Sequence, residues 1–132
     1  MTKAKKVKHL SFMMPDRAGL LSEVTTALSN AKVNVNAVCA YGMQDEATFM
    51  LTTDSNAKAK KALSPLNVEI KEFDVVAVEM TNKSGELQKV AKKLGDAGIN
   101  ISYLYGTTTS GKSATCIFAT SDDANAIKLI NK

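Results

Sequence analysis

The sequence has few of the residues on which disulfide frameworks and many active sites depend. It contains no tryptophan, one histidine (His9) and two cysteines, Cys39 and Cys116, in 132 residues. Two cysteines so far apart predict neither a disulfide framework nor a CxxC site, and they indicate a reducing compartment. No apolar run approaches the ~20 residues that span a bilayer, and no signal peptide is visible. We therefore expect a small cytoplasmic protein.

Catalytic and nucleic-acid-binding constellations are missing as well. His9, the only histidine, sits among alternating strand residues near the lysine-rich N-terminus, and it is expected at a strand surface or edge and not as a general base. No phosphate-binding glycine loop occurs. RNA binding on a sheet needs stacked aromatic residues in a basic, glycine-rich setting, which Phe49, Tyr103 and Phe118 lack. We therefore expect no enzyme activity, no metal or other cofactor, and no nucleic-acid or membrane partner.

The net charge of +4 is concentrated in a short N-terminal segment. Lys3, Lys5, Lys6 and Lys8 precede the first acidic residue, and the other 13 basic residues balance 13 acidic ones. The segment 1–7 is therefore expected to be a solvated basic arm, with contact to an acidic partner as the alternative.

The chain contains an internal repeat. Residues 14–38 align with residues 80–104 at an offset of 66, and with one more residue of offset the segment 47–48 aligns with 114–115. Glycine, helix-face apolar residues and an asparagine stay in step, which indicates a duplication. The identical pairs are Met14/Met80, Gly19/Gly85, Leu21/Leu87, Val24/Val90, Leu28/Leu94, Ala31/Ala97 and Asn34/Asn100.

Each copy has the pattern strand–helix–strand–strand–helix. Short β-rich runs and period-two alternation indicate strands, and apolar residues spaced by three and four indicate amphipathic helices. Asp54 and Ser121 are the candidate caps of the second helices, and Ser110-Gly111 is a candidate hairpin turn. The expected segments are strands at 10–14, 33–37 and 47–52 with helices at 20–31 and 57–63, then strands at 75–80, 99–103 and 113–120 with helices at 87–97 and 124–130.

This order predicts an α+β protein made of two ferredoxin-like units. A further strand at 68–70 completes βαββαβ in the first copy, which gives an antiparallel sheet with two helices on one face. The second copy lacks its last strand, so its sheet edge is either exposed or filled by the N-terminal arm or a partner chain. The expected domains are residues 8–72 and 73–132, preceded by the arm 1–7.

The turn between the first strand and first helix of each copy has the residues of a binding site. Residues 16–20 and 82–86 each place a polar residue three positions before a glycine. Glycine lets the backbone approach a ligand closely, and a helix N-terminus offers N–H groups to a carboxylate. Helix capping by the polar residue is the alternative interpretation. The repetition of the pattern, with Asn34 or Asn100 fifteen residues after the glycine, favours a site.

On these residues the chain resembles the ACT domain, a small amino-acid-sensing module of metabolic regulation. The likeness covers residues 8–132 and makes the chain similar to a free-standing tandem ACT protein with no attached enzyme. The motif that carries it is Asp16-Arg17-Ala18-Gly19-Leu20-Leu21 with Val33-Asn34-Val35, and Asn82-Lys83-Ser84-Gly85-Glu86-Leu87 with Gly98-Ile99-Asn100-Ile101.

The resemblance implies ligand sites where two ACT units pair, each built from the turn of one unit and the second strand of its neighbour. Backbone N–H groups of the turn would hold a carboxylate, Arg17 would clamp it in the first site, and Glu86 would repel an anion in the second. The implied residues are Asp16, Arg17, Ala18, Gly19 and Leu20 with Asn100, and Asn82, Ser84, Gly85 and Glu86 with Asn34.

The function implied by the resemblance is regulation of a metabolic enzyme by a small amino acid, in a protein that forms a homodimer. Two alternatives stay open on the sequence. One is a dedicated regulatory subunit of a biosynthetic enzyme, similar to the small subunit of acetolactate synthase. The other is a protein-interaction module that binds no ligand.

Overall fold

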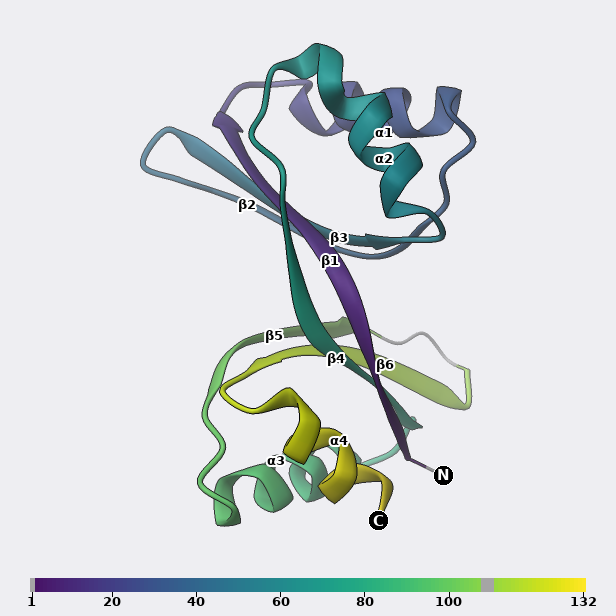
Figure 1. Ribbon diagram of the computed structural model, residues 1–132, viewed down its shortest axis with the longest axis vertical. Coiled ribbons are helices and arrows are strands. Elements are labelled where there is room, and N and C mark those ends of the chain that lie inside the picture. Colours follow the sequence, from purple (N-terminus) through teal and green to yellow (C-terminus); the bar gives the residue numbers. More distant parts are fainter. Residues whose placement is uncertain (1, 108–110) are drawn as a thin grey trace. The chain divides into compact units, whose positions relative to one another are not determined.

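The computed structural model describes residues 2–107 and 111–132 and shows the α+β architecture expected from the duplication (Figure 1). Both copies have the order strand–helix–strand–strand–helix. Ser110, half of the predicted hairpin turn, lies outside the described residues. The elements are β1 (Lys3–Pro15), α1 (Leu20–Asn30), β2 (Val35–Met43), β3 (Glu46–Thr53), α2 (Asn56–Leu63), a 3-10 helix (Ser64–Leu66), β4 (Lys71–Thr81), α3 (Glu86–Asp96), β5 (Ile101–Thr107), β6 (Ser113–Thr120) and α4 (Asp123–Asn131).

The chain divides into two compact units that do not follow the sequence order strictly. The N-terminal unit is Lys8–Phe73, and the C-terminal unit combines Asp74–Lys132 with the described residues up to Val7. Both long strands, β1 and β4, therefore cross from one unit to the other. In the described part of the chain, no helix is long and apolar enough to cross a membrane.

The N-terminal unit is an antiparallel sheet with two helices on one face. Its strand order is β2-β3-β1, with the register Leu10↔Leu51 to Pro15↔Glu46 between β1 and β3. The helices α1 and α2 cover the same face of the sheet (Figure 1). Every second residue of the strands points to the helical face of the sheet and packs against the apolar side of α1. The two-residue period of the strands and the 3.6-residue period of the helix predict this packing. The core includes Leu10, Phe12, Val24, Leu28, Phe49, Leu51 and Leu63.

The C-terminal unit repeats this arrangement with its own elements. Its strand order is β5-β6-β4, and β4 pairs with β6 from Val76↔Phe118 to Thr81↔Ser113. The helices α3 and α4 cover one face of its sheet (Figure 1). The core includes Val76, Val78, Val90, Leu94, Phe118, Ala126 and Ile130.

The expectation of a solvated N-terminal arm is corrected by the structure, because β1 begins at Lys3. Ala4 is 6% exposed and belongs to the core of the C-terminal unit. Its N–H donates to Asn131 Oδ1 at 2.7 Å, and its carbonyl accepts from Asn131 Nδ2 at 2.8 Å. The start of β1 thus lies beside β4 in the place of the last strand that the second copy lacks.

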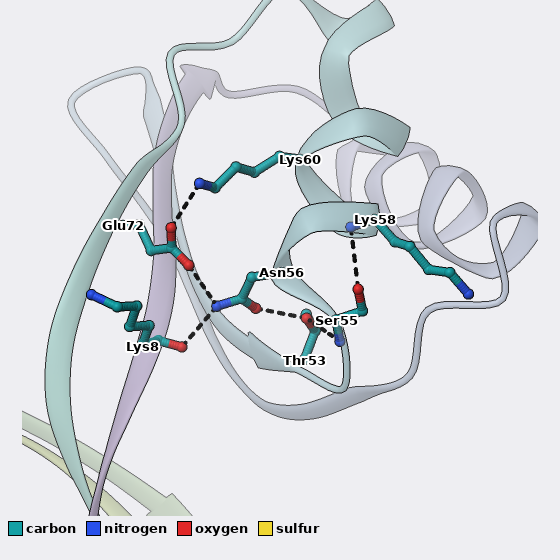
Figure 2. A network of polar contacts seen from close by, with 7 residues as sticks. All are labelled: Lys8, Thr53, Ser55, Asn56, Lys58, Lys60 and Glu72. Carbon is teal, nitrogen blue, oxygen red and sulfur yellow. Dashed lines mark hydrogen bonds and ion pairs between the residues drawn. The ribbon is translucent and has the colours of Figure 1, made fainter.

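The last strand of the N-terminal unit also differs from the prediction. Residues 68–70 are not in a strand, because the 3-10 helix and the left-handed backbone of Asn67 (φ 57°) delay the extended segment until Lys71. Figure 2 shows how the start of β4 is held in this unit. Asn56 Nδ2 donates to the Lys8 carbonyl at 3.0 Å and to Glu72 Oε2 at 3.1 Å, and Lys60 pairs with Glu72 at 2.7 Å.

The caps of the second helices lie one residue later than predicted. Ser55 and Asp122 cap α2 and α4 by accepting from the N–H groups of Lys58 and Asn125. The predicted caps, Asp54 and Ser121, instead bind the backbone just before β2 and β5. Asp54 Oδ1 accepts from the Asn34 N–H at 3.0 Å, and Ser121 Oγ accepts from the Asn100 N–H at 2.9 Å.

His9 is buried, which corrects its expected place at a strand surface or edge. Its side chain has no exposed area, and its ring makes an edge-to-face contact with Phe73 at 6.1 Å between centroids. Burial lowers the pKa of His9, because the charged imidazolium loses hydration in the interior.

Acidification below about pH 6.5, the ordinary pKa of histidine, is expected to destabilise the protein through His9. The lowered pKa means that the unfolded chain takes up the proton first, so the free energy of unfolding falls with pH by at most ~1.4 kcal/mol per pH unit. Urea unfolding at pH 7.0, 6.0 and 5.5 measures this slope. His9→Gln is the control, and an equal slope in that variant would contradict the assignment.

Candidate functional site

The two turns singled out by the repeat have the same backbone geometry. Gly19 and Gly85 precede α1 and α3 with φ of 85° and 90°, a left-handed conformation that favours glycine. Neither helix has a side-chain cap, whereas α2 and α4 are both capped. The N-cap position of each turn is thus occupied by glycine and not by the polar residue. Glycine offers no side chain to the first-turn N–H groups of α1 and α3, which suits a helix N-terminus that receives an anion.

The polar residue of each turn contacts the neighbouring hairpin. The Asp16 N–H donates to the Asp45 carbonyl at 2.9 Å, and the Asp16 carboxylate lies so close to Gly42 that a Cβ there would collide with it. Asn82 Nδ2 donates to the Gly111 carbonyl at 3.0 Å. The backbone N–H of Asp16 and the side chain of Asn82 therefore each tie their turn to the adjacent hairpin.

The remaining turn residues are exposed, apart from the first residue of each helix. Arg17, the predicted carboxylate clamp, is exposed and paired with Glu23. Ala18, Gly19, Ser84 and Gly85 are exposed, while Leu20 and Glu86 are buried.

Glu86 differs from Leu20 in charge at the same point of the fold. Its side chain is 10% exposed, and its Oε2 lies 3.0 Å from Lys89 Nζ. The hydrogen bond from Lys89 lowers the pKa of the Glu86 carboxyl, so a buried negative charge stands at the start of α3.

Asn34 and Asn100 lie at the far end of their own sheets from the turns. Val35, next to Asn34, pairs with Thr53, whereas the turn follows Pro15 at the end where Glu46 pairs. Asn100 has the same position before β5. The structure therefore does not join turn and asparagine within one unit, and the expected pairing of each turn with the other unit's asparagine stays a prediction.

A pocket of about 200 Å³ opens in the C-terminal unit beside its turn. Asn82 and Glu86, both predicted site residues, line it. The sequence reading missed its other walls, although carrying the repeat through the third strands would have shown a small residue, Cys116, where the first copy has Phe49. Both cysteines are partly exposed and unpaired, and burial raises the pKa of Cys116. The lining includes Met80, Lys83, Ala114 and Cys116.

The chain therefore consists of two ferredoxin-like units in tandem, each with a glycine turn before its first helix. The chain belongs to the ACT domain pair family, whose sequence model matches residues 5–132. No match was found among the curated proteins.

Solved structures share the fold over nearly the whole chain. A protein from Bacteroides thetaiotaomicron is 27% identical, with a TM-score of 0.88 over 97% of this chain and 88% of that one. The ligand-free regulatory subunit of aspartate kinase from Thermus thermophilus is 15% identical, with a TM-score of 0.68 over 97% and 94%. The subunit from Thermus flavus is 17% identical, with a TM-score of 0.66 over 98% and 95%.

Proposed function

We propose that this protein is a non-catalytic regulatory protein that binds a small amino acid at its glycine turns. The observation that carries the proposal is the selective lack of side-chain caps on α1 and α3, at the two turns that the duplication preserves. Uncapped N–H groups and the positive end of the helix dipole suit the α-carboxylate of an amino acid. Membership of the ACT domain pair family supports the same ligand class.

Regulation follows if the ligand binds one conformation of the protein better than another. The ligand can shift the equilibrium between the two conformations by no more than the difference in its binding free energy for them. Coupling free energies of this kind are typically ~1–3 kcal/mol. The ligand would bridge the turn of one unit and the asparagine of another, either within the chain or in a cytoplasmic homodimer.

The partner that fits this function is a metabolic enzyme. The Thermus structures, which are regulatory subunits of aspartate kinase, have nearly the same length as this chain and favour the dedicated-subunit alternative for its mode of action. Affinity purification of the chain from its own cells separates the two modes. A stoichiometric large subunit indicates an obligate complex, and a free protein that still binds an amino acid indicates an independent sensor.

A thermal-shift screen against the twenty amino acids at millimolar concentration tests the binding. A ligand at a hundred times its Kd stabilises the native state by ~2.7 kcal/mol, a shift of several degrees in Tm. Gly85→Val is expected to abolish the shift from its turn, because a β-branched residue strains the positive φ although open space surrounds the position.

Gly95→Val is the matched control for the glycine variant. Gly95 also has open space around it, but it lies inside α3 and its φ is not positive. We expect Gly95→Val to keep the ligand response. A screen with no response to any amino acid would leave the protein-interaction module as the better description.

A further inference from the structure

The pocket of the C-terminal unit has apolar inner walls that reach the core. Met80 belongs to the buried core of this unit, and Ala114 and Cys116 pack against it. Its volume of about 200 Å³ exceeds the ~150 Å³ of an apolar cavity that binds benzene. The pocket therefore has room for an apolar group of a few carbon atoms.

The N-terminal unit fills the corresponding space with its own side chains. Strand register makes the positions equivalent, because Phe12 pairs with Phe49 in one unit as Val78 pairs with Cys116 in the other. The two phenylalanine rings stack at 5.1 Å with 7° between their planes. Valine and cysteine are much smaller than two phenylalanines, and Cys116 lines the pocket beside the first turn of α3.

The pocket lining carries one charge of each sign beside the turn. Lys83 lies in the turn, and Glu86 replaces the apolar Leu20 of the other unit. Lys89 Nζ lies 3.0 Å from Oε2 of Glu86. A carboxylate has two acceptor oxygens, so Glu86 can also accept from a ligand ammonium, while Lys83 attracts a ligand carboxylate.

We propose that this pocket is the specificity site of the protein, and that it binds an α-amino acid with a medium-sized apolar side chain. The side chain enters between Met80, Ala114 and Cys116, the α-ammonium binds at Glu86, and the α-carboxylate binds at Lys83 and the turn. This inference rests on the proposed function and assigns the C-terminal unit as the unit that selects the ligand. Polar or charged side chains are disfavoured, because burial against apolar walls removes their hydration.

Isothermal titration of the full chain with leucine, valine, methionine and phenylalanine tests the ligand class, and serine, aspartate and lysine are the comparison set. We expect an apolar amino acid to bind at least tenfold more tightly than any of the comparison set. Isoamylamine and 4-methylvalerate, which each lack one charged group of leucine, are expected to bind at least tenfold more weakly than leucine.

Variants at the pocket locate the binding. Cys116→Phe copies the filled N-terminal unit and is expected to weaken binding at least tenfold, whereas Cys39→Ser, on β2 and outside the pocket lining, is expected to stay within threefold. Glu86→Gln keeps the shape, removes the charge and is expected to weaken binding at least tenfold. If Cys116→Phe does not fold, Ala114→Leu fills the same space from the neighbouring pair of β4 and β6.

Protection of Cys116 gives a direct readout of occupancy. In a Cys39→Ser background, bound leucine is expected to slow alkylation of Cys116 by iodoacetamide. A polar ligand that binds best, or apolar binding that neither pocket-filling variant weakens, overturns the specificity site and leaves amino-acid binding intact. If no amino acid binds the wild-type chain, the proposed function fails together with this inference.

Discussion

Replacing Phe49 with alanine is expected to lower the free energy of unfolding by about 3–5 kcal/mol, the usual cost of removing a buried aromatic side chain. Phe49 is 3% exposed and its ring stacks on Phe12, so its removal leaves a cavity and an unstacked partner. Chemical denaturation in urea measures the loss. A loss of this size is a large part of the free energy of unfolding of a small domain.

The duplicated chain supplies the control for this variant. Cys116→Ala removes a single sulfur atom at the equivalent strand position, where a pocket already exists, and about 1 kcal/mol or less is expected. An equal loss of unfolding free energy in the two variants would show that the two cores are packed alike at this point. That result would contradict the pocket at Cys116.

Deleting residues 2–7 is expected to destabilise the C-terminal unit by roughly 2–4 kcal/mol. The deletion removes the buried Ala4 and its two hydrogen bonds with Asn131, each worth ~0.5–1.5 kcal/mol, and it exposes the edge of β4. A bare strand edge also pairs with other chains, so aggregation is expected to increase. Urea unfolding and light scattering at several protein concentrations measure both effects.

A charge variant separates the role of the strand from that of its lysines. Lys3 and Lys5 are exposed on either side of Ala4, and replacing both with glutamine removes charge while it keeps the strand. We expect the double variant to stay within about 0.5 kcal/mol of the wild type. An unchanged midpoint for the deletion would mean that residues 2–7 do not support the unit.

Much of the fold could be predicted because the signals that define it are local and occur twice. The helix stripes, the glycines at 19 and 85 and the alternation after 33 and 99 depend on neighbouring residues, and each copy checks the other. Strand partners are different, because a short run such as residues 3–7 carries no signal of which edge it will join. The lysines of that run favour a segment exposed to solvent, although lysine is also common on the edge strands of sheets.

The candidate site could be predicted only in its turns. A glycine with positive φ leaves a sequence signature, whereas a pocket is a difference in volume between positions that only the strand register makes equivalent. The burial of His9 was missed for the related reason that Phe73, its ring partner, belongs to the next long strand.

Because β1 and β4 each run from one unit into the other, the duplicated segment of the sequence and the compact unit of the structure have different boundaries. The duplicated segment is strand–helix–strand–strand–helix, and it holds only three strands of a four-stranded unit. Residues 3–7 and 71–73 are the matching extensions of the two first strands, and each completes the other copy. One copy by itself would therefore leave its sheet a strand short, and it needs the extension of the other copy. Joining the two copies in one chain supplies both extensions and lets the interiors of the two units differ, as they do at Phe49 and Cys116.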